Sequence, residues 1–378
     1  EALYSRAPYK GVLTHGFTVD DKGRKMSKSL GNVILPQKVM SSLGADVMRL
    51  WIAATDYANE MGVSDEILKR ISDSYRRMRN TVRFLLGNLA GFDPATDALP
   101  VDQMVAIDRW ALARTAALHE EIVEAYRKYE YHLIYQKIHN FCVVDLGGFY
   151  LDILKDRLYT TPKKSVARRS AQTALYHIAE AMVRWLAPIL SFTAEEIWSY
   201  LPGKRSESVF LETWYQLPGF PSSPAAPSTP MPTPPPTPDN IDWNALIALK
   251  TAVGQELEKL RVAGTIGSPL DAEVEVFCKD EFLERFKSLG EELRFLLIVS
   301  NAQVKRVSNA AGPPVGAIKV AEVAKEGGLW IRVQATPAPK CERCWHHRPE
   351  VGSNAEHPTI CGRCVDNVTG AGESRTFV

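Results

Sequence analysis

Apolar side chains recur at three- and four-residue steps through the first half of the chain, beginning with Ile67, Ile71, Tyr75 and Met78. Such spacing places them along one face of a helix. We expect this helix to begin after Ser64, a residue type that caps helices, and to end near Gly91. The same spacing predicts four more helices, over 102–129, 132–154, 165–188 and 193–201. Long helices with short connections predict a helical bundle.

The pattern changes at residues 218–238, which hold ten of the 24 prolines. Because proline lacks an amide hydrogen and fixes φ, neither a helix nor a central strand can form there. We expect an extended, semi-rigid linker, and a proline-rich ligand for a partner domain is the alternative. Farther on, a small α+β unit is expected, with a helix over 243–262 and strands at 272–277, 295–299 and 329–333.

The composition and charge of the chain indicate which class of protein it belongs to. The chain has 378 residues, 45% hydrophobic and 24% charged, with a net charge of +1, which predicts several globular domains. The charge balance excludes a uniformly basic protein but leaves room for local basic patches. No apolar run approaches the roughly 20 residues of a membrane span, and no signal peptide is visible. We expect a cytoplasmic protein, and the start at Glu1 rather than Met suggests a processed or incomplete product.

Six cysteines divide into two kinds. Cys142 and Cys278 stand alone in apolar stretches and are expected to be ordinary buried thiols. The others form two Cys-x2-Cys pairs, which predict one structural Zn²⁺ with a complete shell of protein ligands: Cys341, Cys344, Cys361 and Cys364. An iron–sulfur or redox site is the alternative, and three nearby histidines could replace a thiol: His346, His347 and His357.

A short basic segment, Lys25-Met-Ser-Lys-Ser29, follows a polar turn and precedes Gly31 and Asn32. Two ammonium groups with hydroxyls between them can hold a polyanion such as a triphosphate. The alternative is an ordinary solvated basic loop.

Basic residues also gather on the predicted helices. Residues 64–91 contain six Lys and Arg but only three Asp and Glu. Residues 155–169 contain six Lys and Arg but only one acidic residue. Such patches suit an RNA backbone. The alternative is that several of these arginines pair with acids on neighbouring helices.

The basic segment, introduced by Leu13-Thr-His-Gly-Phe17 and followed by Gly44–Trp51, resembles the KMSKS signature of class I aminoacyl-tRNA synthetases. The resemblance implies that Lys25 and Lys28 are catalytic and that Lys25, Ser27, Lys28 and Ser29 bind ATP, used with Mg²⁺. The family's His-x-Gly-His motif is absent, so we expect the amino-acid pocket and the editing domain to lie before residue 1.

Two further resemblances narrow the family. The segments Ser64–Leu68, Tyr75–Asn80 and Asp108–Trp110 resemble the anticodon-binding helices of the isoleucine, valine and leucine synthetases. Lys340–His346 and Cys361–Cys364 resemble the C-terminal zinc domain of bacterial isoleucyl-tRNA synthetases. The implied tRNA-binding residues are Arg76, Arg77, Arg79, Arg343, Trp345 and Arg363. Trp345 could instead pack against the α+β unit.

The resulting expectation is a mainly α chain, the C-terminal portion of an isoleucine–tRNA ligase that is monomeric when whole. The expected domains are the end of a Rossmann-type catalytic domain, a helical anticodon-binding domain, the linker, an α+β unit and a zinc finger, over 1–55, 56–215, 216–240, 241–335 and 336–378. Expected partners are isoleucine tRNA and, with the missing part, ATP and L-isoleucine. The alternatives are a valine or leucine ligase fragment, or a non-catalytic tRNA-binding module.

Overall fold

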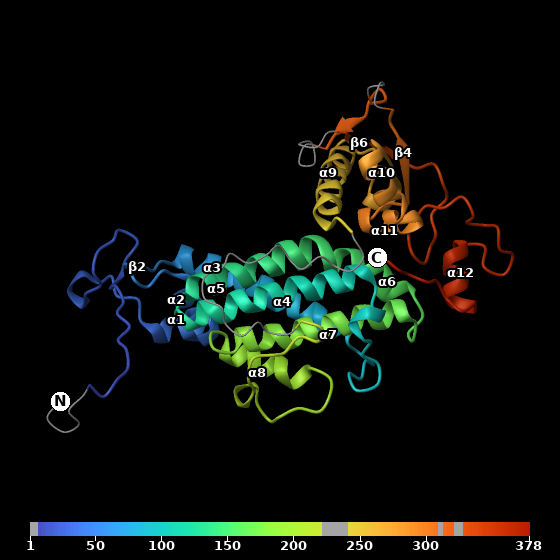
Figure 1. Cartoon of the computed structure of the whole chain (residues 1–378). Coiled ribbons are helices and arrows are strands. Elements are labelled where there is room, and N and C mark those ends of the chain that lie inside the picture. Colours follow the sequence, from blue (N-terminus) through green and yellow to red (C-terminus); the bar gives the residue numbers. More distant parts are fainter. Residues whose placement is uncertain (1–6, 221–240, 309–312, 321–327) are drawn as a thin grey trace. The chain divides into compact units, whose positions relative to one another are not determined.

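The computed structural model describes residues 7–220, 241–308, 313–320 and 328–378 (Figure 1). The chain divides into two compact units. The first contains 1–87, 116–144 and 179–216, and the second contains 88–115, 145–178 and 217–378. Most of the linker predicted at 218–238 falls outside the described residues. Among the described residues, no helix is both long and apolar enough to cross a membrane.

The first unit opens with a small β-structure. Strands β1 (Thr18–Val19) and β2 (Met61–Gly62) pair in parallel. Gly16 donates its N–H to the Tyr57 carbonyl at 2.8 Å, and an added Cβ would lie 2.1 Å from the Asn59 carbonyl oxygen, so only glycine fits this approach. Between the strands lie η1 (Lys28–Leu30), α1 (Pro36–Leu43) and α2 (Ala45–Ala54).

Four of the predicted bundle helices are confirmed as α3 (Asp65–Asn88), α4 (Ala106–Arg127), α7 (Val166–Leu186) and α8 (Ser191–Tyr200), and the fifth begins as α5 (Tyr131–Asn140). Ser64 caps α3 as expected, since its Oγ accepts the N–H of Ile67 at 3.2 Å. Met78 and Leu85 on α3 are fully buried, as their spacing predicts. Parts of α3, α4 and α7 fall in both units.

The segment expected to be one helix over 132–154 is different in the structure. A π-helical stretch, η3 (Phe141–Tyr150), separates α5 from α6 (Leu151–Thr160). A π-helix closes i→i+5 rather than i→i+4 hydrogen bonds and so takes up extra residues per turn. The spacing of apolar residues in the sequence does not distinguish a π-helical stretch from an α-helix, so the sequence pattern did not predict it.

A buried ion pair joins helices of the second unit. Both terminal nitrogens of Arg157 on α6 donate to the Asp108 carboxylate on α4, at 2.6 and 2.9 Å. The hydroxyls of Tyr150 and Ser170 also donate to this carboxylate. The buried charge on Asp108 is therefore fully partnered, as such a group requires.

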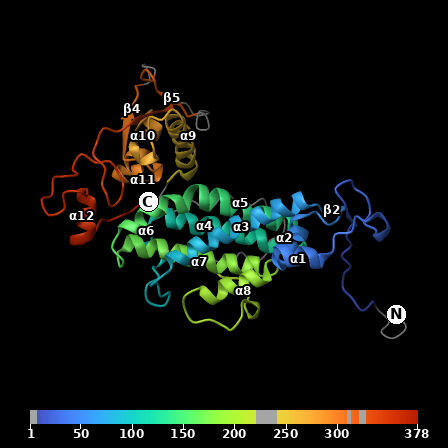
Figure 2. The ribbon, with the colours of Figure 1, turned by 180° about the vertical axis from the view of Figure 1, so that it is seen from behind.

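The α+β part of the second unit contains a four-stranded sheet with the order β4-β3-β6-β5. Its strands are β3 (Ala272–Cys278), β4 (Asn301–Arg306), β5 (Ile318–Lys319) and β6 (Leu329–Ala335). β3 pairs in parallel with β4 and antiparallel with β6. Helix α9 (Trp243–Val262) contacts β6, and α10 (Asp280–Lys287) contacts β3 and β4 (Figures 1 and 2).

The strand predicted at 295–299 is wrong, because these residues belong largely to the short helix α11 (Leu293–Leu297). A buried apolar run of this length has no periodicity that separates helix from strand. Ile298 follows in the left-handed region at φ 57° and ends the helix. The last element is α12 (Gly362–Thr369).

Candidate functional sites

The segment Lys25–Ser29, which we call the lysine loop, is held by a side-chain clasp formed by Asp20 and Asn32. The Asn32 amide accepts the Ser27 N–H at 2.9 Å and donates to the Asp20 carboxylate at 3.0 Å and to the Lys25 carbonyl at 3.3 Å. Asp20 also accepts the backbone and side-chain N–H groups of Arg24. The clasp therefore holds the backbone of the loop at Lys25 and Ser27.

The electrostatics of the clasp follow from these bonds. Donation from Asn32 and from the backbone of Arg24 holds the pKa of the Asp20 carboxyl well below its usual value. Sequence reasoning missed both clasp residues. The available signal was their position, with Asn32 directly after the glycine that closes the loop and Asp20 in the turn before it.

The reactive side chains of the loop are exposed. The Lys25 ammonium lies 5.1 Å from the centre of the Phe17 ring, and Lys28 begins η1. The hydroxyls of Ser27 and Ser29 are 2.6 Å apart, and the Ser27 hydroxyl caps η1 by accepting the Leu30 N–H. In the part of the chain that the structure describes, neither lysine forms an ion pair with a carboxylate, so both charges face solvent.

A groove of about 680 Å³ lies beside the loop in the first unit. Its wall combines clasp residues with cationic side chains of the β-turn, α1 and α3: Lys22, Arg24, Lys38, Lys69 and Arg76. Three carboxylates also line it, those of Asp20, Asp21 and Asp65, and the remaining excess of positive charge attracts anions through the summed field of the fixed charges.

The three arginines predicted to bind RNA on α3 differ in their surroundings. Arg79 forms a bidentate ion pair with Glu196 of α8, at 2.7 and 2.8 Å. Arg76 pairs with Asp73 one turn away, and both side chains are more than half exposed. Arg77 forms no ion pair with a described carboxylate, and its charge adds to burial in lowering the pKa of His139. Arg77 is therefore the freest of the three.

The four paired cysteines come together in the segment that we call the cysteine module, residues 336–378. All four side chains are buried, and their Sγ atoms lie within 4.8 Å of one another. The Sγ atoms of Cys344 and Cys361 are 3.7 Å apart. A disulfide would require about 2.05 Å. Tetrahedral Zn²⁺ with Zn–S bonds of about 2.3 Å places ligand sulfurs about 3.8 Å apart, so this donor set fits the metal.

The thiol chemistry also suits a metal. Hydrogen bonds within the cluster lower the pKa of the Cys361 thiol and raise that of Cys364, as expected of buried thiols that share protons. The thiolate is the form that binds metal. Arg343 points its Nη1 at the Cys364 sulfur, 3.7 Å away. In contrast, burial raises the pKa of Cys142 to about 12 and of Cys278 to about 11, as expected of ordinary buried thiols.

The aromatic and cationic residues of the cysteine module lie in two different environments. Trp345 is 62% exposed and adopts φ 67°, with the Lys340 ammonium 5.9 Å from its ring centre. Arg363, on α12, is only 10% exposed because it forms ion pairs with Asp156 and Glu373. His346 and His347 face Asp156 and Asp271 rather than the sulfurs.

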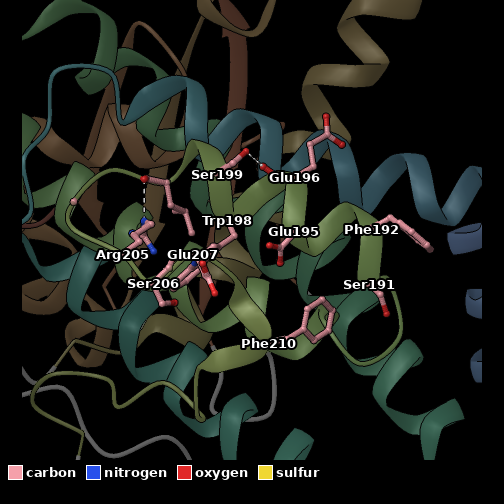
Figure 3. A pocket seen from close by; sticks show the side chains of 12 residues that line it. Ser191, Phe192, Glu195, Glu196, Trp198, Ser199, Arg205, Ser206, Glu207 and Phe210 are labelled. Carbon is pink, nitrogen blue, oxygen red and sulfur yellow. Dashed lines mark hydrogen bonds between the residues drawn. The ribbon is translucent and has the colours of Figure 1, made fainter.

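A larger groove, of about 850 Å³, lies along α8 and the segment that follows it (Figure 3). Two exposed rings, Phe192 and Phe210, are among the side chains that line this groove. Its polar groups serve internal contacts, since Glu195 accepts from Ser208 and Val209 and Glu196 pairs with Arg79. The groove therefore displays no set of free groups that would define a chemistry.

Comparison with known proteins places these features in one family. Models of three families match: class I tRNA synthetases for isoleucine, leucine, methionine and valine over residues 1–64, the anticodon-binding domain of tRNA ligases over 108–276, and a zinc finger found in FPG and IleRS over 339–367. The last contains all four clustered cysteines.

Curated relatives match over the whole chain. Isoleucine–tRNA ligase of Nitrosococcus oceani is 57% identical over 100% of this chain, and that of Methylococcus capsulatus is 55% identical over 100%. The chain spans 38% of the length of each. Among solved structures, Mycobacterium tuberculosis methionyl-tRNA synthetase with methionyl-adenylate matches at 21% identity and a TM-score of 0.46, over 56% of this chain and 42% of that one. The chain belongs to the isoleucine–tRNA ligase family of class I aminoacyl-tRNA synthetases.

Proposed function

We propose that this chain is the C-terminal portion of an isoleucine–tRNA ligase. The whole enzyme would activate L-isoleucine with ATP and Mg²⁺, release pyrophosphate, and transfer the aminoacyl group to isoleucine tRNA. The observation that carries this proposal is the combination, in one chain homologous throughout to these ligases, of the exposed lysine loop and the four-cysteine cluster. Such an enzyme acts in the cytoplasm, and we propose that it is a monomer.

In this proposal the lysine loop acts on the triphosphate. Lys25 and Lys28 place two unpaired ammonium groups where negative charge develops on the departing pyrophosphate, and Ser27 and Ser29 keep the loop in shape. Charge that is already in position costs no reorganisation during the reaction. The clasp of Asp20 and Asn32 supports this role because it holds the Lys25 carbonyl and the Ser27 N–H, on the backbone between the two lysines.

The cysteine module would hold one structural Zn²⁺ through Cys341, Cys344, Cys361 and Cys364. A bound Zn²⁺ with four protein ligands supplies folding energy and no catalytic chemistry. The module then presents Trp345 and Arg343 to RNA, because an exposed ring and a guanidinium on a rigid knuckle suit an unstacked base and a phosphate.

The helical part would bind the anticodon region of the tRNA. Among the α3 arginines, Arg77 and the exposed Arg76 suit direct phosphate contacts. Arg79 and Arg363, which are also proposed tRNA-binding residues, already serve ion pairs with Glu196 and Asp156. We infer that these two act mainly by holding the surfaces that contact RNA.

We further propose that the first residues are the end of a Rossmann-type catalytic domain. Large apolar side chains are exposed there in unusual density: Tyr9, Val12, Leu13, Phe17, Leu30, Val33, Leu35 and Met40. An exposed apolar face of this kind normally packs against another part of a protein. The preceding part of the ligase would cover it and would supply the amino-acid pocket and editing site.

Two measurements test the proposal. The chain alone is expected to bind isoleucine tRNA more tightly than valine tRNA in a fluorescence anisotropy titration. Equal affinity, or preference for the valine tRNA, would contradict the assignment to isoleucine. In isoleucine-dependent ATP–pyrophosphate exchange the chain alone is expected to be inactive, whereas the full-length ligase is active and loses activity on Lys28→Ala. Exchange by the chain alone would show that it is catalytically complete.

A further inference from the structure

Asp156, on α6, has a position that the proposed function does not explain. Its side chain is 16% exposed, accepts hydrogen bonds from two places in the cysteine module and lies near a third. Arg363 of α12 donates through both terminal nitrogens, at 2.7 and 2.8 Å. Arg375 of the C-terminal segment donates at 2.9 Å, and the His346 Nε2 lies 3.6 Å away. One carboxylate therefore contacts a residue just after the first Cys-x2-Cys pair, a residue within the second pair, and the final segment.

The contacts around Asp156 form a closed cluster. Glu373 pairs with the same two arginines, at 3.0 and 2.8 Å. The Phe295 ring of α11 lies under the guanidinium groups of both, 4.8 and 3.4 Å from its centre. Arg375 is only 2% exposed, so its contacts are shielded from solvent. Ion pairs in such surroundings are screened by salt far less than pairs on the surface.

Helix α6, which carries Asp156, is itself fixed. The next residue, Arg157, forms the buried ion pair with Asp108 described above. The two neighbouring charges on α6 therefore point to different partners, one to the helices and one to the cysteine module. The C-terminal segment attaches the cysteine module to the helices at a second place. The N–H groups of Ala106 and Ile107, at the start of α4, donate to the carbonyls of Thr376 and Phe377.

The geometry brings candidate RNA contacts together. Trp345 is adjacent in sequence to His346, whose Nδ1 lies 3.1 Å from Arg294 Nη1 and whose Nε2 faces Asp156, so the backbone that carries the tryptophan is anchored at this point. The turn after α6 carries Lys163 and Lys164. The final segment passes directly over this turn, because a Cβ on Gly372 would lie 2.6 Å from the Pro162 ring. The final segment of the module is thus in contact with the basic turn.

We propose that Asp156 is the positioning residue that orients the cysteine module on α6, so that Trp345 and the basic turn contact one RNA molecule together. This inference rests on the proposed function for the identity of the RNA. Asp156 acts through Arg363, Arg375 and His346 and does not itself touch the RNA.

The test compares Asp156→Asn with Asp152→Asn in the 378-residue chain. Asp152 lies one turn earlier on α6, is 41% exposed and pairs with Lys155. Asp156→Asn is expected to bind isoleucine tRNA about tenfold more weakly. The slope of log affinity against log salt is expected to fall by about 1 to 2, which corresponds to losing the module's phosphate contacts. Asp152→Asn should bind isoleucine tRNA with the same affinity and salt slope as the parent. Asp156→Glu should recover part of the affinity that Asp156→Asn loses.

Zinc content and hydrogen exchange separate positioning from folding. In Asp156→Asn the zinc content and the exchange rates of α4 and α7 should remain those of the parent, while amides of 336–378 exchange about tenfold faster. Unchanged affinity and salt slope would overturn the inference. So would a loss of zinc or of helix protection, because Asp156 would then be supporting the fold. Failure of the parent to bind tRNA would contradict the proposed function, and the exchange measurement would still test the hold of Asp156 on the module.

Discussion

At the scale of single residues, the structure shows that small polar groups decide where the reactive ones lie. Lys25 and Lys28 are visible in the sequence, but their arrangement depends on one amide, that of Asn32, which bonds to a carboxylate, a carbonyl and an N–H. Such a side chain cannot be replaced by an apolar one without leaving its partners unpaired.

Asn32→Ala is therefore expected to misplace the lysine loop. In the full-length ligase, kcat of isoleucine-dependent pyrophosphate exchange should fall about 10- to 100-fold, with KM for isoleucine nearly unchanged, because the geometry of the reacting groups is lost rather than the amino-acid pocket. The control is Asp21→Asn, at an exposed neighbour of the clasp. An equal loss in the control, or none in Asn32→Ala, would rule out the clasp.

His119 predicts a pH dependence of stability. The Trp185 indole donates to its Nδ1 at 2.9 Å, and burial lowers its pKa. Because the unfolded imidazole titrates near 6.5, the unfolded chain takes up the proton first as pH falls. The free energy of unfolding should be constant above about pH 7 and decline through pH 6.5 and below. His119→Gln should make this decline shallower in urea titrations and leave the part due to His139 and His346, whose pKa values are also lowered by burial. His15→Gln, at an exposed site, should leave the decline unchanged.

At the scale of elements, α6 carries two adjacent charged residues with different partners: Asp156 contacts the cysteine module, and Arg157 contacts Asp108 of α4. The side chain of Arg157 is 2% exposed and faces a fully buried carboxylate, so its contribution to stability depends on the pair remaining complete. The helix itself was expected from the sequence only as far as Leu154, because the charged run after it gives no apolar periodicity.

Arg157→Met is expected to lower the free energy of unfolding by about 3–5 kcal/mol, because Asp108 would remain buried without its cation. Lys155→Met, two residues earlier and exposed, should change it by less than about 0.5 kcal/mol. Chemical denaturation followed by circular dichroism measures both. Similar small effects for the two variants would mean that Asp108 finds water or another donor.

A substitution on α9, Lys250→Met, is expected to raise the free energy of unfolding, whereas Arg157→Met lowers it. Burial lowers the pKa of Lys250, which lines a cavity of about 210 Å³ with Asp152 and Leu257. A lowered lysine pKa means that protonation disfavours the folded state at every pH below the unfolded value near 10.4. Lys250→Met should therefore stabilise the chain by about 0.5–2 kcal/mol at pH 7. The gain should shrink as pH rises toward 10.4, and a gain independent of pH would point to packing instead.

At the scale of the whole molecule, the cysteine module is the part whose fold depends most on a ligand. It contains one described helix of 8 residues, α12, and its four thiols are buried together. Zn²⁺ contributes on the order of 10 kcal/mol to the folding of small zinc modules at neutral pH.

Removal of the metal by a chelator is expected to release the module and weaken tRNA binding, while the helical circular dichroism signal changes little. Metal analysis should give about one equivalent of zinc in the parent, less in Cys341→Ser, and the parental amount in Cys278→Ser. Loss of the bundle's helical signal on chelation would contradict the separation of module and helices.

Local patterns predicted much of this molecule. Helical periodicity, the alternation at 272–277, the Cys-x2-Cys spacing and the lysine loop all depend on residues close together in the chain. The sequence by itself therefore determined most helices of the bundle, the strands β3 and β6, the grouping of the four cysteines and the family. Features without a local signal were missed or misassigned: the π-helical η3, the helix α11 and the clasp.

Only the tertiary structure decided which charges are free and which are committed. Arg77 and Arg79 look alike in the sequence, yet only Arg79 meets Glu196, from a helix more than 100 residues away. Arg363 resembles an RNA ligand until folding brings it to Asp156. An ion pair forms only when packing places its partners within a few ångströms and removes water, and this information lies in long-range contacts rather than in the composition of either segment.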